Sequence, residues 1–441
     1  MGKVGIIGAG LAGCEAAWAA VNLNADVTLF EMKPHEYTPA HQSPLFAELV
    51  CSNSLKAMRI ESAAGLLKEE MRRLNSVCLK AAEKSAVPAG GALAVDRALF
   101  SAFVTEMIKS HPRIRIEHRE VVKPFIEGVD AVVIATGPLT SPALSERLQQ
   151  MFGKALSFYD AAAPIVSADS VDMDYAFYGS RYGKGGEDGD YVNCPLNKQE
   201  YEEFHAALIN AKTAPLHSFD KSGDIKVYQG CMPIETLAKR GLDAIRFGPM
   251  KPVGLTDPRT GRRPWAVVQL RKENLQGTML NMVGFQTNLT FGEQKRVFSL
   301  IPALHSAEFL RYGVMHRNTF LDSPRLLAPS FALKDNPKMF FAGQITGVEG
   351  YMESASSGIV AGINAARAAE SKPPLILPED TMIGALAKYI SDPEVKDFQP
   401  MGANFGLLPP LDDIIKNKQE RYAAYAKRAL QSLQKAVFEL E

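Results

Sequence analysis

Three short, uninterrupted runs of apolar residues predict buried strands. They are Lys3–Ile7 (KVGII), Asp130–Ile134 (DAVVI) and Lys338–Ala342 (KMFFA). Each run is followed by a glycine within a few residues, and helical stretches of small residues follow the first and the last. Continuous apolar runs of this length are typical of parallel strands whose two faces are covered by helices. The pattern therefore predicts an α/β fold with a Rossmann-like domain.

The first run opens a complete dinucleotide-binding unit. It continues into the turn Gly8-Ala9-Gly10-Leu11-Ala12-Gly13, a helical stretch, and a second strand, Asp26–Phe30, that is followed by Glu31. Gly8 permits the tight turn, Gly10 lets the backbone approach a pyrophosphate, and Gly13 allows the helix to pack closely on the strand. The helix N terminus offers unpaired N–H groups to phosphates, and Glu31 can accept hydrogen bonds from an adenosine ribose. This order predicts a bound dinucleotide, but it does not separate FAD from NAD.

A second glycine-rich turn, near the other end of the chain, favours FAD. The last apolar run leads into residues 343–351 (GQITGVEGY) and then into a helix of small residues, Ser354–Ala369. A glycine-rich turn before a helix forms an anion site, and FAD is a long cofactor whose flavin end commonly lies near such a C-terminal helix. The expected cofactor contacts in this half are Gly137, in the ATGP segment after the middle run, and Gly343, Gly347, Glu349, Gly350 and Tyr351.

The length of the chain and a change of character along it predict an inserted domain. At 441 residues the chain is long enough for two to three domains. Between about 151 and 330, short elements and tyrosines predominate, and no helix follows a glycine fingerprint. We expect residues 1–150 and 331–441 to form an FAD-binding domain that is interrupted by an inserted α+β domain at 151–330. The last 60 residues are expected to contain two helices, separated by Gln399–Pro410.

Composition excludes several classes of protein. No apolar run approaches the roughly 20 residues of a membrane span, and the N-terminal apolar run is the first strand, without the features of a signal peptide. Five cysteines without a CxxC pair argue against a disulfide framework or a zinc site. We therefore expect a cytoplasmic protein without a metal. Lys+Arg and Asp+Glu both total 49, so nucleic-acid binding requires a local basic patch.

Two of the cysteines are candidates for chemistry. Cys51 lies in a run of small polar residues after a strand-like piece, Glu48–Val50, and Cys231 precedes Met-Pro in a turn that enters a helix. Thiols at helix N termini have lowered pKa values, although a buried, unreactive side chain is the commoner role of a single cysteine. Cys14 and Cys78 lie within apolar helical stretches and fit that commoner role. The sequence leaves Cys194 undecided.

Short segments spread over nearly the whole chain carry a resemblance to a known family. They are GAGLAGCEAAW (8–18), LFEMKP (29–34), TPAHQ (38–42), ELVCSNSL (48–55), AGGALAVDR (89–97), ATGPLTS (135–141), CMPIETLAKRG (231–241), FGPMKPVGL (247–255), DPRTG (257–261), VGFQTNL (283–289), RYGVMHRNTF (311–320), GVEGYMESA (347–355) and FQPMGANFGLLPP (398–410). In these segments the chain resembles the folate- and FAD-dependent tRNA uracil-5-methyltransferases, within the wider family of glucose-inhibited-division flavoproteins.

The resemblance implies methylation of a tRNA T-loop uridine to ribothymidine. Methylenetetrahydrofolate would donate the carbon and FADH2 the electrons, with NADPH or NADH reducing the flavin. Carbon 5 of uracil is a poor nucleophile until a thiolate adds to carbon 6, so two cysteines at family positions suit the chemistry. Cys231 is assigned as the nucleophile, and Cys51 as a base or as a guard of the flavin adduct. The reverse assignment stays open.

The resemblance also implies positions for folate and RNA. His41 and His316 match family histidines and are candidates to face the folate, although either could have a purely structural role. The tRNA needs a local positive surface, and its target uridine has to be flipped into the site. The basic candidates are Arg259, Arg262, Arg263, Arg317, Lys416, Lys418 and Arg421, with Lys427 and Arg428 in the same tail. No membrane contact and no obligatory protein partner are expected.

Several other functions stay open. The same chemistry could act on a ribosomal RNA uridine. A plain FAD/NAD(P)H oxidoreductase would need neither the two cysteines nor a folate pocket. The related wobble-uridine modifier works with a separate GTPase partner and lacks the CMPIETLAKRG segment. A flavin-stabilised RNA chaperone would tolerate loss of both cysteines.

Overall fold

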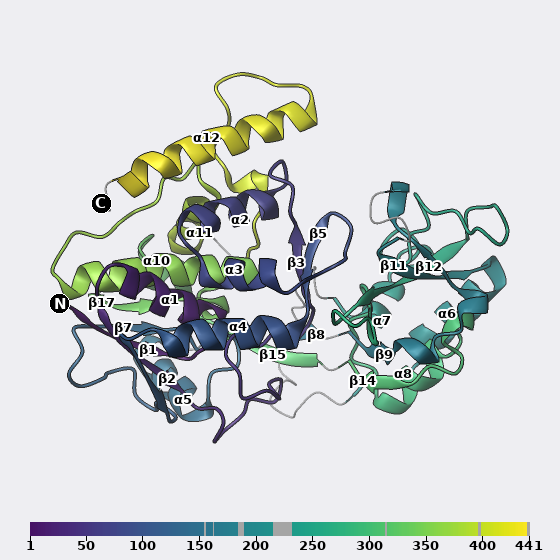
Figure 1. Ribbon diagram of the computed structural model, residues 1–441, viewed down its shortest axis with the longest axis horizontal. Coiled ribbons are helices and arrows are strands. Elements are labelled where there is room, and N and C mark those ends of the chain that lie inside the picture. The colour runs from purple at the N-terminus through teal and green to yellow at the C-terminus, as the bar shows by residue number, and fades with distance from the viewer. Residues whose placement is uncertain are drawn as a thin grey trace.

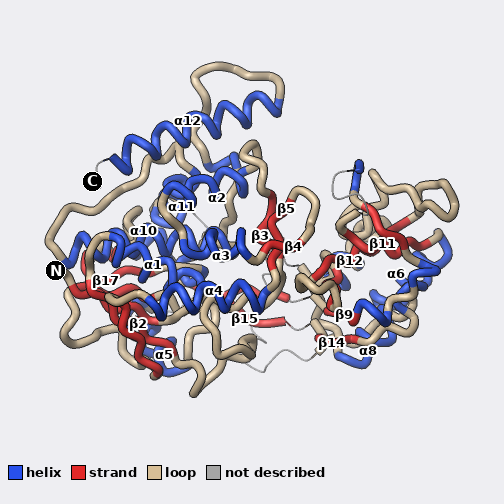
Figure 2. The backbone as a smooth tube through the Cα atoms, in the orientation of Figure 1, coloured by secondary structure: helices blue, strands red, loops and turns tan. Residues whose placement is uncertain are grey.

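The computed structural model divides into two lobes joined by short strands (Figures 1 and 2). It describes residues 1–153, 156–161, 163–183, 189–214, 232–313, 315–395 and 398–438, with only the backbone of 156–161, 315–319 and 438. The larger lobe contains both ends of the described chain and is built on a mostly parallel sheet. The smaller lobe is built on an antiparallel sheet. We call them the parallel-sheet lobe and the antiparallel-sheet lobe.

The sheet of the parallel-sheet lobe confirms the three apolar runs as strands. Its order is β16 (Ala332–Leu333), β17 (Asn336–Phe341), β7 (Ala131–Ile134), β1 (Lys3–Ile7), β2 (Asp26–Glu31) and β6 (Ile114–His118). All neighbours pair in parallel except β16 and β17. The central strands are almost fully buried, which explains why their sequences are apolar throughout instead of alternating. The expected Rossmann-like α/β fold is therefore confirmed.

Helices cover this sheet and complete its core. They are α1 (Leu11–Asn22), α2 (Ala63–Arg73), α3 (Val77–Lys84), α4 (Arg97–Ser110), α5 (Pro142–Phe152), α9 (Ser323–Leu326), α10 (Tyr351–Ala369), α11 (Met382–Ser391) and α12 (Lys418–Phe438). The last two confirm the helices expected in the tail. The segment between them contains only a short 3₁₀ turn, Phe405–Leu407, in its described part. A small three-stranded sheet, β3 (Ser54–Ala57), β5 (Ala92–Val95) and β4 (Ala86–Val87), extends toward the other lobe.

Helices α1 and α10 pack backbone to backbone. A Cβ atom added to Gly358 would lie 2.1 Å from the carbonyl oxygen of Ala12, and one added to Gly362 would lie 2.3 Å from that of Ala16. Both contacts advance by four residues in the same direction along each helix, so the helices run parallel. Their N termini therefore point toward the same edge of the sheet. Residues from the two ends of the chain meet at that edge.

The antiparallel-sheet lobe confirms the expected inserted α+β architecture. Its strands are ordered β10 (Phe177–Gly179), β11 (Tyr191–Leu196), β12 (Ala266–Lys272), β13 (Met279–Met282), β9 (Ile165–Ser167) and β14 (Phe309–Arg311), all antiparallel to their neighbours. Its helices α6 (Lys198–Ile209), α7 (Ile234–Ala238) and α8 (Phe291–Phe298) enclose a separate apolar core. The boundaries 1–150, 151–330 and 331–441 stay a prediction.

The chain passes between the lobes through a two-stranded ribbon. Strand β8 (Leu156–Ala161) leads toward the antiparallel-sheet lobe, and β15 (Met315–Phe320) leads back. The two strands pair antiparallel along their whole length, from Leu156 opposite Phe320 to Ala161 opposite Met315. The entry and the exit of the lobe are therefore held side by side.

The contact between α1 and α10 predicts the effect of one added methyl group. Gly358→Ala places a Cβ atom inside the van der Waals radius of the Ala12 carbonyl, so the helices must separate. Such overpacking costs about 1–3 kcal/mol, and we expect a lower thermal unfolding midpoint together with weaker retention of a flavin. Gly292→Ala is the matched control, since a Cβ there meets no atom within 4 Å. An unchanged midpoint in Gly358→Ala would contradict the role assigned to this contact.

Candidate functional site

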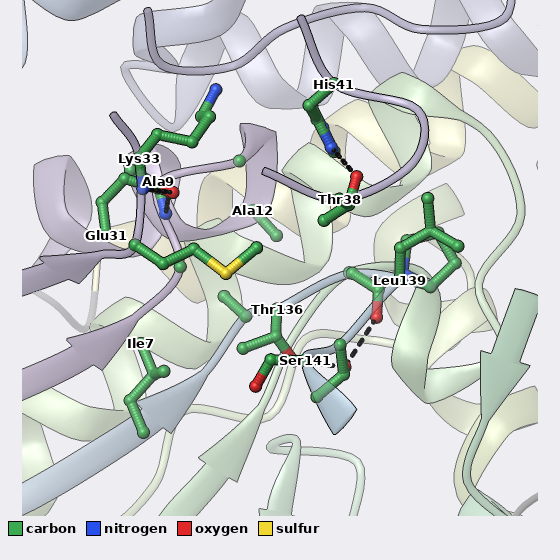
Figure 3. Close-up of a pocket in the computed structure, with 18 of the residues that line it drawn as sticks. Ile7, Ala9, Ala12, Glu31, Lys33, Thr38, His41, Thr136, Leu139 and Ser141 are labelled. Atoms are coloured by element: carbon green, nitrogen blue, oxygen red, sulfur yellow. Dashed lines mark hydrogen bonds between the residues drawn. The ribbon is translucent and has the colours of Figure 1, made fainter. Parts of the chain in front are cut away.

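A large cavity opens where the N termini of α1 and α10 meet the carboxyl ends of the central strands (Figure 3). Its empty space, including the solvent at its mouth, is about 1150 Å³. Several residues expected to bind a dinucleotide line it. These are Gly8, Ala9, Gly10, Leu11, Ala12, Glu31, Gly137, Gly343 and Tyr351. The structure thus brings the first glycine turn, the ATGP segment and the second glycine turn into one site, although they lie far apart in the sequence.

Two glycines of the first turn are required by close backbone packing. Gly8 has φ +97°, and an added Cβ would lie 2.7 Å from the carbonyl oxygen of Ala135. At Gly13 an added Cβ would lie 1.8 Å from the carbonyl oxygen of Gly8. Gly10 differs, because a Cβ there would meet no atom within 4 Å and the residue lines the cavity. The empty space beside Gly10 fits the close approach of a pyrophosphate.

The N terminus of α1 is available to an anion. Gly10 caps the helix without a side-chain hydrogen bond, and the first turn carries no acidic residue. Glu31 holds the preceding turn, since its carboxylate accepts the N–H of Ala9 at 2.8 Å and that of Lys33 at 2.9 Å. Unpaired first-turn N–H groups and the helix dipole favour a phosphate at this place. These features fit the pyrophosphate and adenosine parts of FAD.

Four residues expected to contact the cofactor lie outside the cavity lining: Gly13, Gly347, Glu349 and Gly350. At Gly347 φ is +85°, and an added Cβ would lie 2.4 Å from the ring of Phe398. The carboxylate of Glu349 instead accepts the side-chain amide of Gln344 at 2.5 Å. Gly350, with φ +119°, caps α10. In the described structure Gly13 packs against Gly8 in the first turn, the other three residues shape the second turn, and Gly343 and Tyr351 line the cavity.

Cys51 lies against Tyr351, next to the cavity. Its Sγ atom is 2.9 Å from the hydroxyl oxygen of Tyr351. The same oxygen accepts the N–H of Cys51 at 2.8 Å and that of Ser52 at 3.2 Å. A phenol oxygen has two acceptor positions and one hydrogen, so the hydrogen is left to point at the sulfur. Burial raises the pKa of Tyr351, which keeps the phenol protonated at neutral pH.

The segment before Cys51 is held by arginines. The guanidinium of Arg97 donates to the carbonyls of Leu49 at 2.9 Å and Val50 at 3.2 Å, and that of Arg311 donates to Val50 at 2.9 Å. The expectation of a strand-like piece at residues 48–50 is therefore wrong. Its carbonyls bond to side chains instead of a neighbouring strand.

A third arginine holds the segment after Cys51. Arg271 donates to the side-chain oxygen of Asn53 at 2.7 Å and to Ser52 Oγ at 3.2 Å. Arg271 and Arg311 belong to the antiparallel sheet, while Arg97 starts α4 and forms an ion pair with Glu273. Sequence reasoning missed all three arginines. Arg97 and Arg311 lie in segments that carry the family resemblance, which is the one signal that could have singled them out.

Three of the other four cysteines are buried, and the fourth lies outside the described residues. Cys14, Cys78 and Cys194 are fully buried, and burial raises the pKa of each thiol, to about 12 for Cys194. Their thiolates are therefore disfavoured at neutral pH, as expected for Cys14 and Cys78, and Cys194 joins them. Cys231 lies outside the described residues. The expected helix after it is present as α7, with Pro233 as its N-cap.

One of the two candidate folate histidines lines the cavity. His41 Nδ1 lies 2.6 Å from Thr38 Oγ1, and both residues line the cavity. Burial and then Lys33 lower the pKa of His41, which favours the neutral ring. His316 belongs to β15, where its backbone lies opposite that of Asp160 in the neighbouring strand β8. The side chains of His316 and Arg317 lie outside the described residues.

The basic candidates for RNA binding fall into two groups on different lobes. Arg259 is tied down by its own turn, because it pairs with Asp257 at 2.7 Å and donates to the Asp174 carbonyl. Arg262 and Arg263 in the same turn are exposed.

The second group belongs to the tail. Lys416, Lys418 and Lys427 are exposed there, while Arg421 donates to the Ile415 carbonyl. Arg428 donates to the carbonyls of Pro409 and Pro410 and so fixes α12.

Among the described residues, no helix is long and apolar enough to cross a membrane. The same part of the chain contains no group of three or more His, Cys, Asp and Glu side chains placed to hold a metal ion.

The cavity predicts a substitution that separates folding from cofactor binding. In Gly10→Val the new side chain enters open space, so the protein is expected to fold in the absence of flavin, with an unfolding midpoint lowered only by the poorer N-cap that valine gives α1. The same side chain occupies the place expected for the pyrophosphate, so FAD absorbance in the purified protein should be lost. Gly91→Val is the matched control, because a Cβ there also meets open space, outside the lining. Full FAD content in Gly10→Val would refute this placement.

Comparisons with known proteins agree with this architecture. A sequence profile of the family described as "Glucose inhibited division protein A" matches residues 3–373. A protein of Heliobacterium modesticaldum, named methylenetetrahydrofolate--tRNA-(uracil-5-)-methyltransferase TrmFO, is 57% identical over 437 residues, which cover 99% of this chain and 98% of that protein. The protein of the same name from Enterococcus faecalis is 56% identical, covering 97% of each.

A solved structure gives independent support for the fold. Aquifex aeolicus GidA has a TM-score of 0.70 at 18% identity, covering 98% of this chain and 76% of that one. An identity this low supports the fold alone. The sequence matches go further: this chain belongs to the glucose inhibited division protein A family and, within it, to the group formed by these TrmFO relatives.

Proposed function

We propose that this protein is an FAD- and folate-dependent methyltransferase that converts a T-loop uridine of tRNA to 5-methyluridine. Methylenetetrahydrofolate is the carbon donor, and NADPH or NADH is the source of electrons. The observation that carries the proposal is the 57% identity, over 99% of this chain, to a relative named as a methylenetetrahydrofolate-dependent tRNA (uracil-5-)-methyltransferase. The glycine-lined cavity beside Cys51 supports it, because it offers a dinucleotide site next to a thiol.

Different residues of the cavity are proposed to contact different parts of the cofactor. The N–H groups of Gly10, Leu11 and Ala12 would hold the pyrophosphate, Glu31 would bind the adenosine ribose, and Tyr351 with Gly343 would contact the flavin end. FAD, once reduced, supplies the hydride that completes the methyl group. The chain itself has to orient the uracil, activate it and keep water away. His41 would face the folate; its position in the cavity lining and the lowered pKa that favours its neutral ring support this role.

Two thiols carry the activation of uracil. We assign Cys231 as the nucleophile whose sulfur bonds to carbon 6, which moves electron density to carbon 5 for attack on the one-carbon unit. Cys51 then takes the proton from carbon 5 as the bond between the one-carbon unit and the nitrogen that carried it breaks, which leaves a methylene group double-bonded to carbon 5. When hydride has been delivered, the bond from Cys231 to carbon 6 breaks and the thiolate is released. The Tyr351 hydrogen that points at the sulfur of Cys51 supports this assignment, because a hydrogen bond to sulfur stabilises a thiolate.

The exposed basic residues Arg262 and Arg263, and the lysines of the tail, are proposed to contact RNA phosphates. The domain boundaries 1–150, 151–330 and 331–441 are kept in this proposal, and the separate core of the antiparallel-sheet lobe supports them. We further propose that the protein works in the cytoplasm. The buried, unpaired thiols of Cys14, Cys78 and Cys194 support a reducing compartment.

A methyl-transfer assay with parallel substrates tests the proposed function. Purified protein is incubated with labelled methylenetetrahydrofolate, NADPH or NADH, and either transcript tRNA or ribosomal RNA fragments. We expect label at carbon 5 of a tRNA uridine and none when S-adenosylmethionine replaces the folate. Label in ribosomal RNA alone would move the same chemistry to another substrate. Oxidation of NAD(P)H without any labelled RNA would show that the protein is a plain flavin oxidoreductase.

The roles of the two cysteines predict different behaviour toward 5-fluorouridine-substituted tRNA. With fluorine at carbon 5 the proton cannot be removed, so a nucleophilic cysteine stays bonded to the base. We expect a denaturation-resistant complex with the wild type and with Cys51→Ala, and none with Cys231→Ala. Both variants should lose methylation by several orders of magnitude while keeping FAD and RNA binding. A complex that persists in Cys231→Ala and disappears in Cys51→Ala would reverse the assignment.

A further inference from the structure

Aromatic side chains form a ladder from the core of the antiparallel-sheet lobe to its surface. Phe298 is fully buried, and its ring centroid lies 6.3 Å from that of Phe309. Phe309 stacks on Tyr312 at 5.6 Å and 9°, and Tyr312 stacks on Phe291 at 4.9 Å and 15°. Phe291, the last ring, is 55% exposed. The ladder therefore ends in a preformed pair of parallel rings at the surface.

A buried glutamine fixes this pair. The side-chain amide of Gln294 in α8 donates to the carbonyl of Gly313 at 2.8 Å and accepts the N–H of Gly313 at 2.8 Å. Gly313 directly follows Tyr312, and Gln294 lies one turn after Phe291. These two reciprocal bonds hold Tyr312 against the start of α8. The ring pair is therefore ordered before any ligand arrives, which lowers the entropy cost of stacking on it.

The strand that leads into Tyr312 contacts the segment that carries Cys51. Arg311, next to Tyr312, donates to the carbonyl of Val50 at 2.9 Å, and Val50 precedes Cys51. One arginine side chain thus separates the backbone at Tyr312 from the segment that carries the thiol. In Figure 1, α8 and β14 lie in the antiparallel-sheet lobe, and β15 leads from them to the parallel-sheet lobe.

We propose that Phe291 and Tyr312 form a stacking platform for an unpaired RNA base next to the target uridine. This inference rests on the proposed function and adds a binding residue to it. Unpaired bases of RNA loops are commonly held by stacking on aromatic rings. When the target uridine is flipped out, its neighbour loses a stacking partner. An exposed aromatic ring, on the lobe whose Arg311 holds the segment of the thiol, replaces that partner.

The charges around the platform suit RNA. Lys295 and Arg296 are exposed in the last turn of α8, and Lys212 lies beside its start, since the backbone N–H of Thr290 donates to the carbonyl of Lys212 at 3.0 Å. Glu293, in the first turn, is the carboxylate of this helix and pairs with Arg296 at 2.6 Å. Three cations against one anion attract a phosphate backbone. This excess of positive charge would not favour binding of a second protein through an apolar surface.

Substitution of Phe291 tests the platform. Phe291→Leu keeps an apolar side chain but removes the aromatic face, and Phe291→Trp enlarges that face. We expect the dissociation constant for a T-arm RNA hairpin to rise about tenfold in the leucine variant and to be unchanged or lower in the tryptophan variant. The slope of log Kd against log salt should be the same in all three proteins, because stacking releases no counterions.

A fluorescent base identifies the occupant directly. Hairpins carrying 2-aminopurine at each position around the target uridine are titrated with protein. One position is expected to lose fluorescence on binding the wild type, to keep it with Phe291→Leu, and to lose it again with Phe291→Trp. Phe125→Leu is the matched control, because Phe125 is 58% exposed and belongs to the parallel-sheet lobe. It should behave as the wild type, and all variants should retain FAD.

The outcomes separate this inference from the function on which it rests. A wild type that neither binds nor methylates RNA would overturn the proposed function, and the platform with it. Normal methylation with equal Kd and equal quenching in Phe291→Leu would overturn the platform alone. A leucine variant that binds RNA normally but fails to self-associate, when the wild type forms dimers, would show that a second copy of the chain occupies the rings.

Discussion

The close contact between α1 and α10 is the interaction on which the rest of this structure depends. Gly358 and Gly362 let α10 approach the backbone of α1 at Ala12 and Ala16, closer than any other residue type would permit. Because the two helices are parallel, this approach directs both N termini at one cavity. The first glycine turn and the second one are distant in sequence, and the cofactor site exists only where this contact brings them together. The site therefore depends on small residues outside its lining as well as on those that line it.

The segment around Cys51 depends in turn on both lobes. Its backbone and side chains are held by Arg97 from one lobe and by Arg271 and Arg311 from the other. Holding a loop with three guanidinium groups has a cost in free energy, because burial of a charge is unfavourable unless the charge is fully paired. In return they hold the segment by rigid, forked donors on both sides of the thiol. The role proposed for Cys51, which is to take a proton from one atom of a base, needs this accuracy.

Local patterns allowed much of this site to be predicted, and long-range contacts account for what was missed. The turn at Gly8–Gly13 and the strand ending on Glu31 are adjacent in sequence, so their spacing alone indicates the site. The arginines have no such spacing, and they meet Cys51 only after the lobes have packed. The apolar residues Leu49 and Val50 resembled a strand because composition does not reveal which groups their carbonyls bond. Gly347 and Gly350 show a different limit, because the sequence does not reveal that their positive φ angles and close neighbours require glycine in the turn itself.

The distance in sequence between α1 and α10 has a consequence for the order in which the chain acquires structure during its synthesis. The core of the antiparallel-sheet lobe is formed by residues between Val166 and Ala307, so it is complete once that stretch has left the ribosome. The start of α1 has to wait for Gly358, about 350 residues after Ala12, which takes roughly 20–70 s at 5–20 residues per second. Its alanine face lacks a partner for all of that time. The part of the chain made first is therefore the last to be finished, and a nascent chain cannot hold its flavin until almost all of it has been made.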